Sequence, residues 1–539
     1  MTPLAPLAFT APTINYGLFA PVLFVLGAAC VGILVEAFAP RALRFQIQVA
    51  LSLIALAAAF VNLVLNWGIA SRALIDPVTV GQVVTGSLIH DGATQVMWAM
   101  LLGFGFVSLL LFAERRVHGG VTAFTPMAAA TPGSKAETEA AEAGLEHTEA
   151  FPLALFSLSG MLLIVAANDL LTMFVALEIL SFPLYVLCGL ARHRRLLSQE
   201  SALKYFLLGS GASAMLLFGV ALVFGYSGSF AYDGIVTAVT LSQESDRLLI
   251  GGVALIAVGL LFKIGAVPFH AWVPDVYQGA PTPVTSFMAV CTKIAAAGAL
   301  LRIFYVCFGG ARLTWQPVIA AVAILTMIVG TVVAIVQTDI KRLLAYSSVA
   351  HAGFLLTAVT GAATTQSGLA DGQLGSVGAI LFYLIGYGFA TIGCFAVVTV
   401  VRAHGREATE LSQWAGLGRR YPVIGISMVI LLLSLAGIPL TAGFVGKFAV
   451  FTAAWQGGYW WLALVAVLVS VVAVYIYLRV IIVLFFREPA GEAEVTIAGP
   501  MTLIVLAISL IGTLVLGIAP APVTNVIAQA AEFLHAVAG

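Results

Sequence analysis

Residues 248–270, LLIGGVALIAVGLLFKIGAVPFH, determine how the rest of the chain is interpreted. The run is apolar and long enough to cross a bilayer, since a spanning helix needs about 20 such residues. It nevertheless contains Lys263, and the following Pro268 lacks the N–H that would bond the carbonyl of Ile264. Interrupted backbone at membrane depth is tolerated only where it lines protein or water. We therefore predict a broken membrane helix whose lysine faces a hydrated cavity.

The whole chain shares this apolar character. Of its 539 residues, 61% are hydrophobic and only 9% are charged, with a formal net charge of zero. An ordinary soluble domain has about 25% charged residues. The composition excludes a soluble globular enzyme, a disordered chain and a nucleic-acid binder, which needs a basic surface. The five cysteines are not spaced as a metal or redox pair, so no metal or cofactor site is predicted in this chain.

The apolar runs predict an all-α polytopic membrane protein with about 14 transmembrane helices. The runs are too evenly apolar for the strands of a membrane barrel, which alternate. No Lys or Arg precedes Arg41, so we expect the first run to stay as a span and not to be a signal peptide. The predicted spans are 16–38, 46–68, 93–113, 151–168, 170–190, 203–226, 248–270, 283–308, 317–337, 343–362, 375–401, 423–453, 459–486 and 500–520.

Basic residues give the expected orientation, because cytoplasmic loops are enriched in Lys and Arg. They follow the odd-numbered spans, whereas the alternate loops hold only four arginines. We therefore expect both termini on the outer side of the membrane. The basic residues after odd spans are Arg41, Arg44, Arg115, Arg116, Arg192, Arg194, Arg195, Lys341, Arg342, Arg402, Arg406, Arg419, Arg420 and Arg487, and the others are Arg72, Arg247, Arg302 and Arg312.

Three of the six lysines, Lys263, Lys293 and Lys447, lie inside apolar runs. A charge at the bilayer centre costs at least ~2.5–3.5 kcal/mol on insertion scales. Lysine can lose its proton when buried, whereas arginine effectively cannot. These lysines are therefore predicted to exchange protons. The alternative is that each is a structural lysine bound to free backbone carbonyls.

Three further residues join these candidates. Glu178 is the one carboxylate near the middle of a span and is predicted to pair with a buried lysine, either as a switch or as a fixed ion pair. Lys204, at the start of the sixth span, lies one helical turn after Glu200 and could instead extend to the membrane surface. His351 could relay protons or be a satisfied core histidine.

The twelfth span has an interruption like that of the seventh. Pro439 lies in GIPLTAGFVGK, residues 437–447, which ends at Lys447. Two Pro- and Gly-interrupted spans with one lysine each are typical of transporters built from repeated halves. Residues 117–150 break the apolar pattern with a polar, acidic stretch, in which 136–150 is a candidate surface helix. We expect a solvated, mobile linker, with a docking site for a neighbouring subunit as the alternative.

These residues lie in motifs with a family resemblance. The stretch FHAWVPDVYQGAPTPVT, residues 269–285, resembles the signature of the antiporter-like subunits of proton-pumping NADH:quinone oxidoreductase, respiratory complex I. YSSVAHAG at 346–353, ALKYF at 202–206 and SLAGIPLTAGF at 434–444 are similar to the sequences of its subunit N. The motifs extend from about Leu177 to Lys447.

The resemblance implies two inverted five-helix repeats with broken helices 7 and 12. It also implies a proton route along Glu178, Lys204, Lys263, Lys293 and Lys447, with His351 as a candidate relay. The implied regions are 1–116 for helices 1–3, 117–150 for the acidic cytoplasmic linker, 151–310 and 311–490 for the repeats, and 491–539 for helix 14 and the tail. NADH, FMN, iron–sulfur clusters and quinone would belong to partner subunits.

The function implied is a proton-translocating subunit of a bacterial NADH:quinone oxidoreductase in the plasma membrane. Its expected partners are the other membrane and peripheral subunits and the lipid bilayer, with no nucleic acid. The alternative is a subunit of a multi-subunit sodium/proton antiporter, which shares the buried charges. A third reading is a scaffold subunit whose buried ions are structural.

Overall fold

The computed structural model describes residues 13–67, 82–84, 86–241, 247–362, 374–489, 493–496 and 498–530. Arg72 and the tail beyond Ala530 lie outside the described residues. The described chain is almost entirely helical. Its α-helices are α1 (Tyr16–Phe38), α2 (Arg41–Leu65), α4 (Gly92–Phe112), α5 (Lys135–Glu142), α6 (Ala150–Ala166), α7 (Leu170–Cys188), α8 (Arg195–Ser227), α9 (Tyr232–Leu241), α10 (Arg247–Ile264), α11 (Trp272–Gly279), α12 (Thr282–Phe287), α13 (Lys293–Leu301), α14 (Arg312–Ile335), α15 (Ile340–Val359), α16 (Ser376–Val400), α17 (Leu417–Arg420), α18 (Pro422–Ala436), α19 (Ala442–Gln456), α20 (Trp460–Phe486), α21 (Pro500–Ile518) and α22 (Ala521–Ala530).

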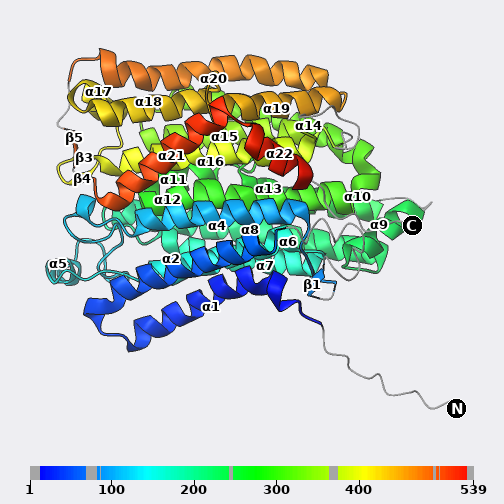
Figure 1. Ribbon diagram of the computed structural model, residues 1–539, viewed down its shortest axis with the longest axis horizontal. Helices are drawn as coiled ribbons and strands as arrows, with labels where there is room; N and C mark the ends of the chain where they lie inside the picture. The colour runs from blue at the N-terminus through cyan, green and yellow to red at the C-terminus, as the bar shows by residue number, and fades with distance from the viewer. Residues whose placement is uncertain are drawn as a thin grey trace.

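Shorter elements complete the fold. Two segments are π-helical: η2 (Met288–Thr292) joins α12 to α13, and η3 (Arg302–Cys307) continues α13, so that the four form one continuous helical segment. Two small antiparallel sheets lie at opposite ends of the helices (Figure 1). Their strands are β1 (Gln82–Val84), β2 (Leu88–Ile89), β3 (Val401–Ala403), β4 (Arg406–Glu407) and β5 (Glu494–Val495), and the 3-10 turns are η1 (Arg116–His118), η4 (Gly309–Ala311) and η6 (Leu411–Trp414).

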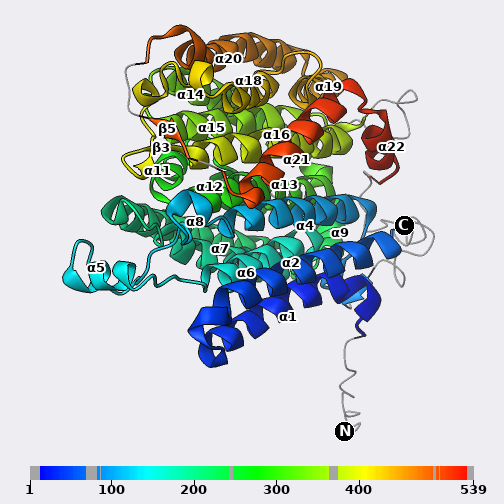
Figure 2. The same cartoon turned by 60° about the vertical axis from the view of Figure 1, so that its left-hand side comes forward.

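The long helices lie side by side in one bundle, from α1 and α2 at one edge to α18 and α20 at the other (Figures 1 and 2). α21 crosses the bundle obliquely over α16. Central helices are buried on all sides: residues 282–304, for example, contain no exposed position. Helices at the rim expose large apolar side chains, such as Phe38, Phe218 and Val471. This distribution suits a protein whose outer surface faces lipid, because lipid leaves backbone groups no partner except the helix itself.

Each of the predicted spans contains helix, which confirms the all-α membrane fold. Among the described residues, 12 helices are long and apolar enough to cross a membrane, or up to 13 if the bent pair Leu411–Arg420 and Pro422–Ala436 is one span. α6 has 17 residues, and the predicted twelfth span is divided into α18 and α19 of 15 residues each. The count of 14 spans and the division into inverted repeats remain predictions.

Both predicted helix breaks are present, but a glycine and not the proline starts each one. α10 ends before Gly265, which has φ +83°, and α18 ends before Gly437, which has φ +85°. The next residue in each case, Ala266 or Ile438, donates its N–H to the carbonyl five residues earlier, at 2.9 and 3.0 Å respectively. This is the glycine-capped helix end in which a left-handed residue satisfies the last carbonyls. Pro268 and Pro439 lie inside the breaks, a few residues after the glycine that ends each helix.

The 117–150 linker is attached to the bundle, which contradicts the expected mobile linker. The buried Arg195 guanidinium bonds Glu137 at 2.9 Å and the Thr125 hydroxyl at 2.7 Å. Arg115 bonds Glu146 at 2.6 Å. The helix is also shorter than expected, covering Lys135–Glu142. The acidic residues were assigned to solvent because sequence alone does not show that arginines of distant loops approach them.

Arg302 was expected in a loop, but it lies in η3 and is 1% exposed. Its guanidinium bonds Asp91, which is also 1% exposed, at 3.0 Å, and the Thr94 hydroxyl at 2.7 Å. Its Nε donates to the Val165 carbonyl at 3.1 Å. Asp91 also accepts the N–H of Thr94 at the start of α4. This ion pair joins α4, the end of α6 and the η3 segment.

Asp91→Asn is therefore expected to destabilise this chain by about 3–5 kcal/mol, because removing one partner leaves a buried charge without its counter-ion. The amide can still cap α4, so a lower stability would result from the missing negative charge and not from a missing cap. The measurements are the heat-denaturation midpoint of this chain in the purified assembly and its amount in membranes. Asp233→Asn, at the exposed start of α9, is the control. Equal stability of the two variants would contradict a structural role for the pair.

Candidate functional site

Lys263 lies in the last turn of α10, directly before the first break, and is 5% exposed. Its Nζ donates to the Ser181 hydroxyl of α7 at 2.7 Å and to the Tyr205 hydroxyl of α8 at 3.2 Å. Nζ also lies 5.2 Å from the centroid of the Tyr205 ring. Tyr205 is held by Trp272 of α11, whose ring stacks on it with centroids 4.6 Å apart. The aromatic residues on both sides of the break thus position the partner of the lysine.

Glu178 does not form the direct ion pair that we predicted. Within the described residues, no carboxylate lies within 4.0 Å of Lys263 Nζ. Ser181, which lies one helical turn after Glu178 on α7, contacts the lysine instead. Glu178 Oε1 is buried and has no hydrogen-bond partner among these residues. The sequence suggested that the two charges pair but could not show that a serine of α7 bonds the lysine instead.

Lys293 begins α13, at the end of the π-helical segment η2, and is 4% exposed. Its Nζ donates to the Ser348 carbonyl at 2.5 Å and to the Ser348 hydroxyl at 2.8 Å. The Tyr387 hydroxyl of α16 donates to the same serine oxygen at 2.8 Å, and the Tyr387 ring centroid lies 4.9 Å from Nζ. Ser348 therefore connects three helices at one point.

His351 is buried on α15, one turn beyond Ser348. Its Nδ1 lies 2.5 Å from the Tyr383 hydroxyl and its Nε2 lies 3.3 Å from the Tyr477 hydroxyl. The Tyr477 hydroxyl is also 2.6 Å from Ser347 Oγ. An imidazole with a hydroxyl at each ring nitrogen can accept a proton on one side and give one up on the other. Both ring nitrogens are therefore partnered, as a relay and a satisfied core histidine would each require.

Lys447 lies on α19, after the second break, and is 4% exposed. Its Nζ donates to the Ala436 carbonyl at the end of α18 and to the Ser470 hydroxyl of α20, both at 2.9 Å. A Cβ added at Gly437 would lie 2.8 Å from Lys447 Cδ, so the glycine also makes room for the lysine. The freed end of the broken helix thus supplies an acceptor, as the structural alternative for this lysine requires.

Three residues at intervals of three on α15 join these sites. Ser348 holds Lys293, His351 follows it, and the ring of Phe354 lies next to both His351 and Lys447. The Phe354 centroid is 5.8 Å from that of His351 and 4.8 Å from Lys447 Nζ. No hydrogen bond within the described residues connects the Lys263 cluster to the Lys293 cluster.

Lys204 is separate from this row. It is 44% exposed and bonds Glu200 at 2.7 Å, as predicted, and Asp275 of α11 at 2.8 Å. Asp275 also bonds Arg342 at 2.8 Å, so α8, α11 and α15 are joined at this end of the bundle. Lys204 therefore does not belong to the buried set.

The hydroxyl partners were missed in the sequence. Ser347 and Ser348 precede His351 in a motif that we quoted, so their proximity to it could have been noticed. Nothing in the sequence distinguishes Ser181, Ser470 or Tyr477 from other polar residues of the spans. Their roles depend on contacts between helices far apart in the chain.

Comparison with known proteins agrees with this geometry. The family described as "NADH:quinone oxidoreductase/Mrp antiporter, TM" matches residues 167–474. A protein of Nocardioides sp. named NADH-quinone oxidoreductase subunit N is 53% identical over 98% of this chain and 100% of its own length. This chain belongs to the family of NADH-quinone oxidoreductase subunit N. The subunit N of Rhodococcus opacus is 51% identical over 97% of both chains.

Solved structures show the same fold as that of this subunit N family member. A chain of respiratory complex I from Thermus thermophilus matches 95% of this chain and 100% of its own, with 30% identity and a TM-score of 0.74. A chain of the Mrp complex from Dietzia sp. matches 96% of this chain and 97% of its own, with 21% identity and a TM-score of 0.76. The second likeness concerns the fold alone.

Ser348→Ala is expected to lower coupled turnover about tenfold or more, because a hydrogen bond to a charged group contributes about 1.5–3 kcal/mol. Assembly should persist, since Lys293 keeps the Ser348 carbonyl. The measurements are NADH:quinone turnover and proton uptake by vesicles containing the whole assembly. The control is Ser286→Ala, which changes a buried serine of α12, in the helical segment that carries Lys293; its hydroxyl has no partner among the described residues. Identical behaviour of the two variants would show that Ser348 has no special role.

Proposed function

We propose that this chain is a proton-translocating membrane subunit of a bacterial NADH:quinone oxidoreductase, with Lys263, Lys293 and Lys447 as proton carriers and His351 as a relay. The observation that carries the proposal is the nature of the lysine partners. Each of these three lysines binds at least one hydroxyl oxygen, and no carboxylate of the described residues lies within 4.0 Å of any of them.

Hydroxyl partners allow the lysine to exist with or without its extra proton. A hydroxyl can accept a hydrogen bond from an ammonium group, and after rotation it can donate one to a neutral amine. A carboxylate can accept only, and would favour the charged lysine. Ser181, Ser348 and Ser470 provide this two-way contact at Lys263, Lys293 and Lys447 in turn. The lysine sites are therefore suited to gaining and losing protons.

Glu178 supplies the proposed switch. Its carboxylate lies on the same helix as Ser181, one turn earlier, and its buried Oε1 is unbonded within the described residues. Movement of α7 relative to α10 would bring the carboxylate toward Lys263 and favour proton uptake, and the reverse movement would favour release. Electron transfer in partner subunits would drive this movement. The route from Lys263 to Lys293 would pass through water.

The remaining parts of the proposal follow from the family. NADH, FMN, iron–sulfur clusters and quinone would be bound by partner subunits. The chain would lie in the bacterial plasma membrane with both termini outside, and Lys204 would lie near the proton entrance and not in the central row. The regions 1–116, 117–150, 151–310, 311–490 and 491–539 keep the roles predicted for them. The antiporter alternative is weaker, because the likeness to the Mrp chain is one of fold.

Lys263→Ala is expected to reduce coupled turnover at least tenfold and to lower the number of protons moved per NADH oxidised. Loss of a positioned proton donor typically costs about 10²–10⁴ in rate. The measurement uses the whole assembly in sealed vesicles, with assembly checked by the co-purifying chains. Lys135→Ala, which removes an exposed lysine of α5, is the control. Normal assembly with an unchanged proton-to-electron ratio in Lys263→Ala would refute the assignment.

Glu178→Gln tests the switch separately. The amide keeps the size of the side chain but cannot favour the charged lysine by its own charge. We expect normal assembly, with turnover lowered to a similar extent as in Lys263→Ala. A fixed structural ion pair would instead show loss of assembly in both variants, with normal turnover per assembled unit.

A further inference from the structure

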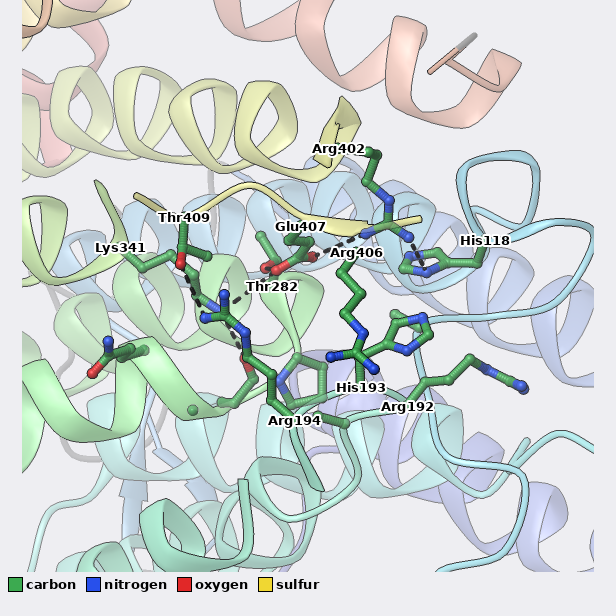
Figure 3. A pocket seen from close by; sticks show the side chains of 16 residues that line it. His118, Arg192, His193, Arg194, Thr282, Lys341, Arg402, Arg406, Glu407 and Thr409 are labelled. Carbon is green, nitrogen blue, oxygen red and sulfur yellow. Dashed lines mark hydrogen bonds and ion pairs between the residues drawn. The ribbon is translucent and has the colours of Figure 1, made fainter. Parts of the chain in front are cut away.

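A strongly basic pocket lies outside the lysine row, at the end of the bundle where β3, β4 and α5 lie (Figures 1 and 3). Its walls are the loop before α8, the connection between α11 and α12, the start of α15 and the β3–β4 hairpin. The lining contains five side chains with a formal positive charge and a single carboxylate, that of Glu407. The five are Arg192, Arg194, Lys341, Arg402 and Arg406.

The single carboxylate compensates only part of this charge. Glu407 lies 3.9 Å from both Lys341 Nζ and Arg402 Nη1, beyond hydrogen-bonding distance, and accepts instead from the Thr282 hydroxyl at 2.7 Å. Arg402 is 4% exposed, yet its Nε and Nη1 have no hydrogen-bond partner within the described residues. A buried guanidinium with unbonded donors is unfavourable, so such a group in a native protein requires an explanation.

Two of the other arginines of the pocket, Arg194 and Arg406, have no carboxylate partner among the described residues. Arg194 donates to the Thr409 hydroxyl at 3.0 Å, and Arg402 Nη2 contacts His118 Nδ1 at 2.8 Å (Figure 3). Among the described residues no carboxylate lies within 4.0 Å of Arg194 or Arg406. Burial, followed by repulsion from Arg402, Arg192 and Arg406, lowers the pKa of His193 below its ordinary value. The pocket therefore has an uncancelled positive field.

We infer that this pocket binds a phosphate-class oxyanion. Arginine guanidinium groups match the oxygens of phosphate, and charge-assisted bonds to them are among the stronger hydrogen bonds. The internal volume of about 40 Å³ holds only a few water molecules, which is room for one tetrahedral oxyanion. The unbonded donors of Arg402, with Arg194, Arg406 and Lys341, are the groups that would bind it. This site is independent of the proposed proton route.

The anion could be free phosphate or the headgroup of a phospholipid, which share this chemistry. The apolar part of the lining consists of small side chains, Ala123, Ala191, Ala280 and Pro281. No long aliphatic or aromatic side chain is present in the lining to hold an acyl chain. The pocket therefore favours the free anion, and it would connect Arg194 of the first half of the chain to Arg402 and Arg406 of the second.

Binding of radiolabelled inorganic phosphate to the whole assembly tests the inference. The assembly is placed in phosphatidylcholine nanodiscs in phosphate-free buffer and studied by equilibrium dialysis. Arg406→Gln is the main variant, because Arg406 is exposed and its side chain makes no hydrogen bond or ion pair within the described residues. Arg194→Gln is a second variant, and Arg487→Gln, exposed at the same end but outside the pocket, is the control.

We expect one saturable phosphate site in the wild type and in Arg487→Gln. In Arg406→Gln and Arg194→Gln the affinity for phosphate should be about tenfold lower, because each variant loses about one charge-assisted bond. Phosphate sites in other subunits cancel in this comparison. Repeating the measurement in phosphatidylglycerol discs identifies the source. If phosphate binding in phosphatidylglycerol discs equals that in phosphatidylcholine discs, the ligand is the free anion. If phosphatidylglycerol abolishes phosphate binding in the wild type and in Arg487→Gln, both of which have an intact pocket, the lipid headgroup occupies the site. Equal phosphate binding by the wild type and both pocket variants in phosphatidylcholine would overturn the inference.

Discussion

The structure depends on the rule that backbone polar groups inside a membrane must find partners within the protein. Each of the two helix breaks satisfies this rule with a glycine in the left-handed conformation, which caps the helix before it. A lysine lies next to each capped helix end. Lys263 precedes the first glycine, and Lys447 bonds the carbonyl of Ala436, which precedes the second. The positions of the two lysines thus follow from how the backbone ends.

Much of this could be predicted from the sequence. Helices in lipid are long, apolar and continuous, so the spans, the interruptions near Pro268 and Pro439 and the three buried lysines stand out against an apolar background. The cause of the breaks was assigned to proline because proline is the stronger helix breaker in general. The helices end at Gly265 and Gly437 because the cap needs a residue in the left-handed conformation. Which residue adopts it depends on the path of the chain after the helix.

The contacts between distant helices could not be predicted. The partner of Lys263 proved to be Ser181 and not Glu178, because side-chain direction on α7 depends on how that helix packs. The pair of Arg302 with Asp91 and that of Arg195 with Glu137 join residues far apart in sequence. The number of charged residues in a segment does not show which of them form such pairs. An arginine in a predicted loop can be exposed or can be a buried anchor of the fold.

Two groups of buried cations differ in the residues that hold them. Arg302 and Arg195 bond carboxylates directly, and such pairs hold elements in place because removing either partner leaves a buried charge. Lys263, Lys293 and Lys447 bond hydroxyl and carbonyl oxygens instead. Arginine cannot release its proton in a protein, so an anionic partner suits a permanent charge. A hydroxyl suits a group that must bind equally well in two protonation states, which is why we propose the lysine row, and not the arginine pairs, as the part of the molecule that changes its charge.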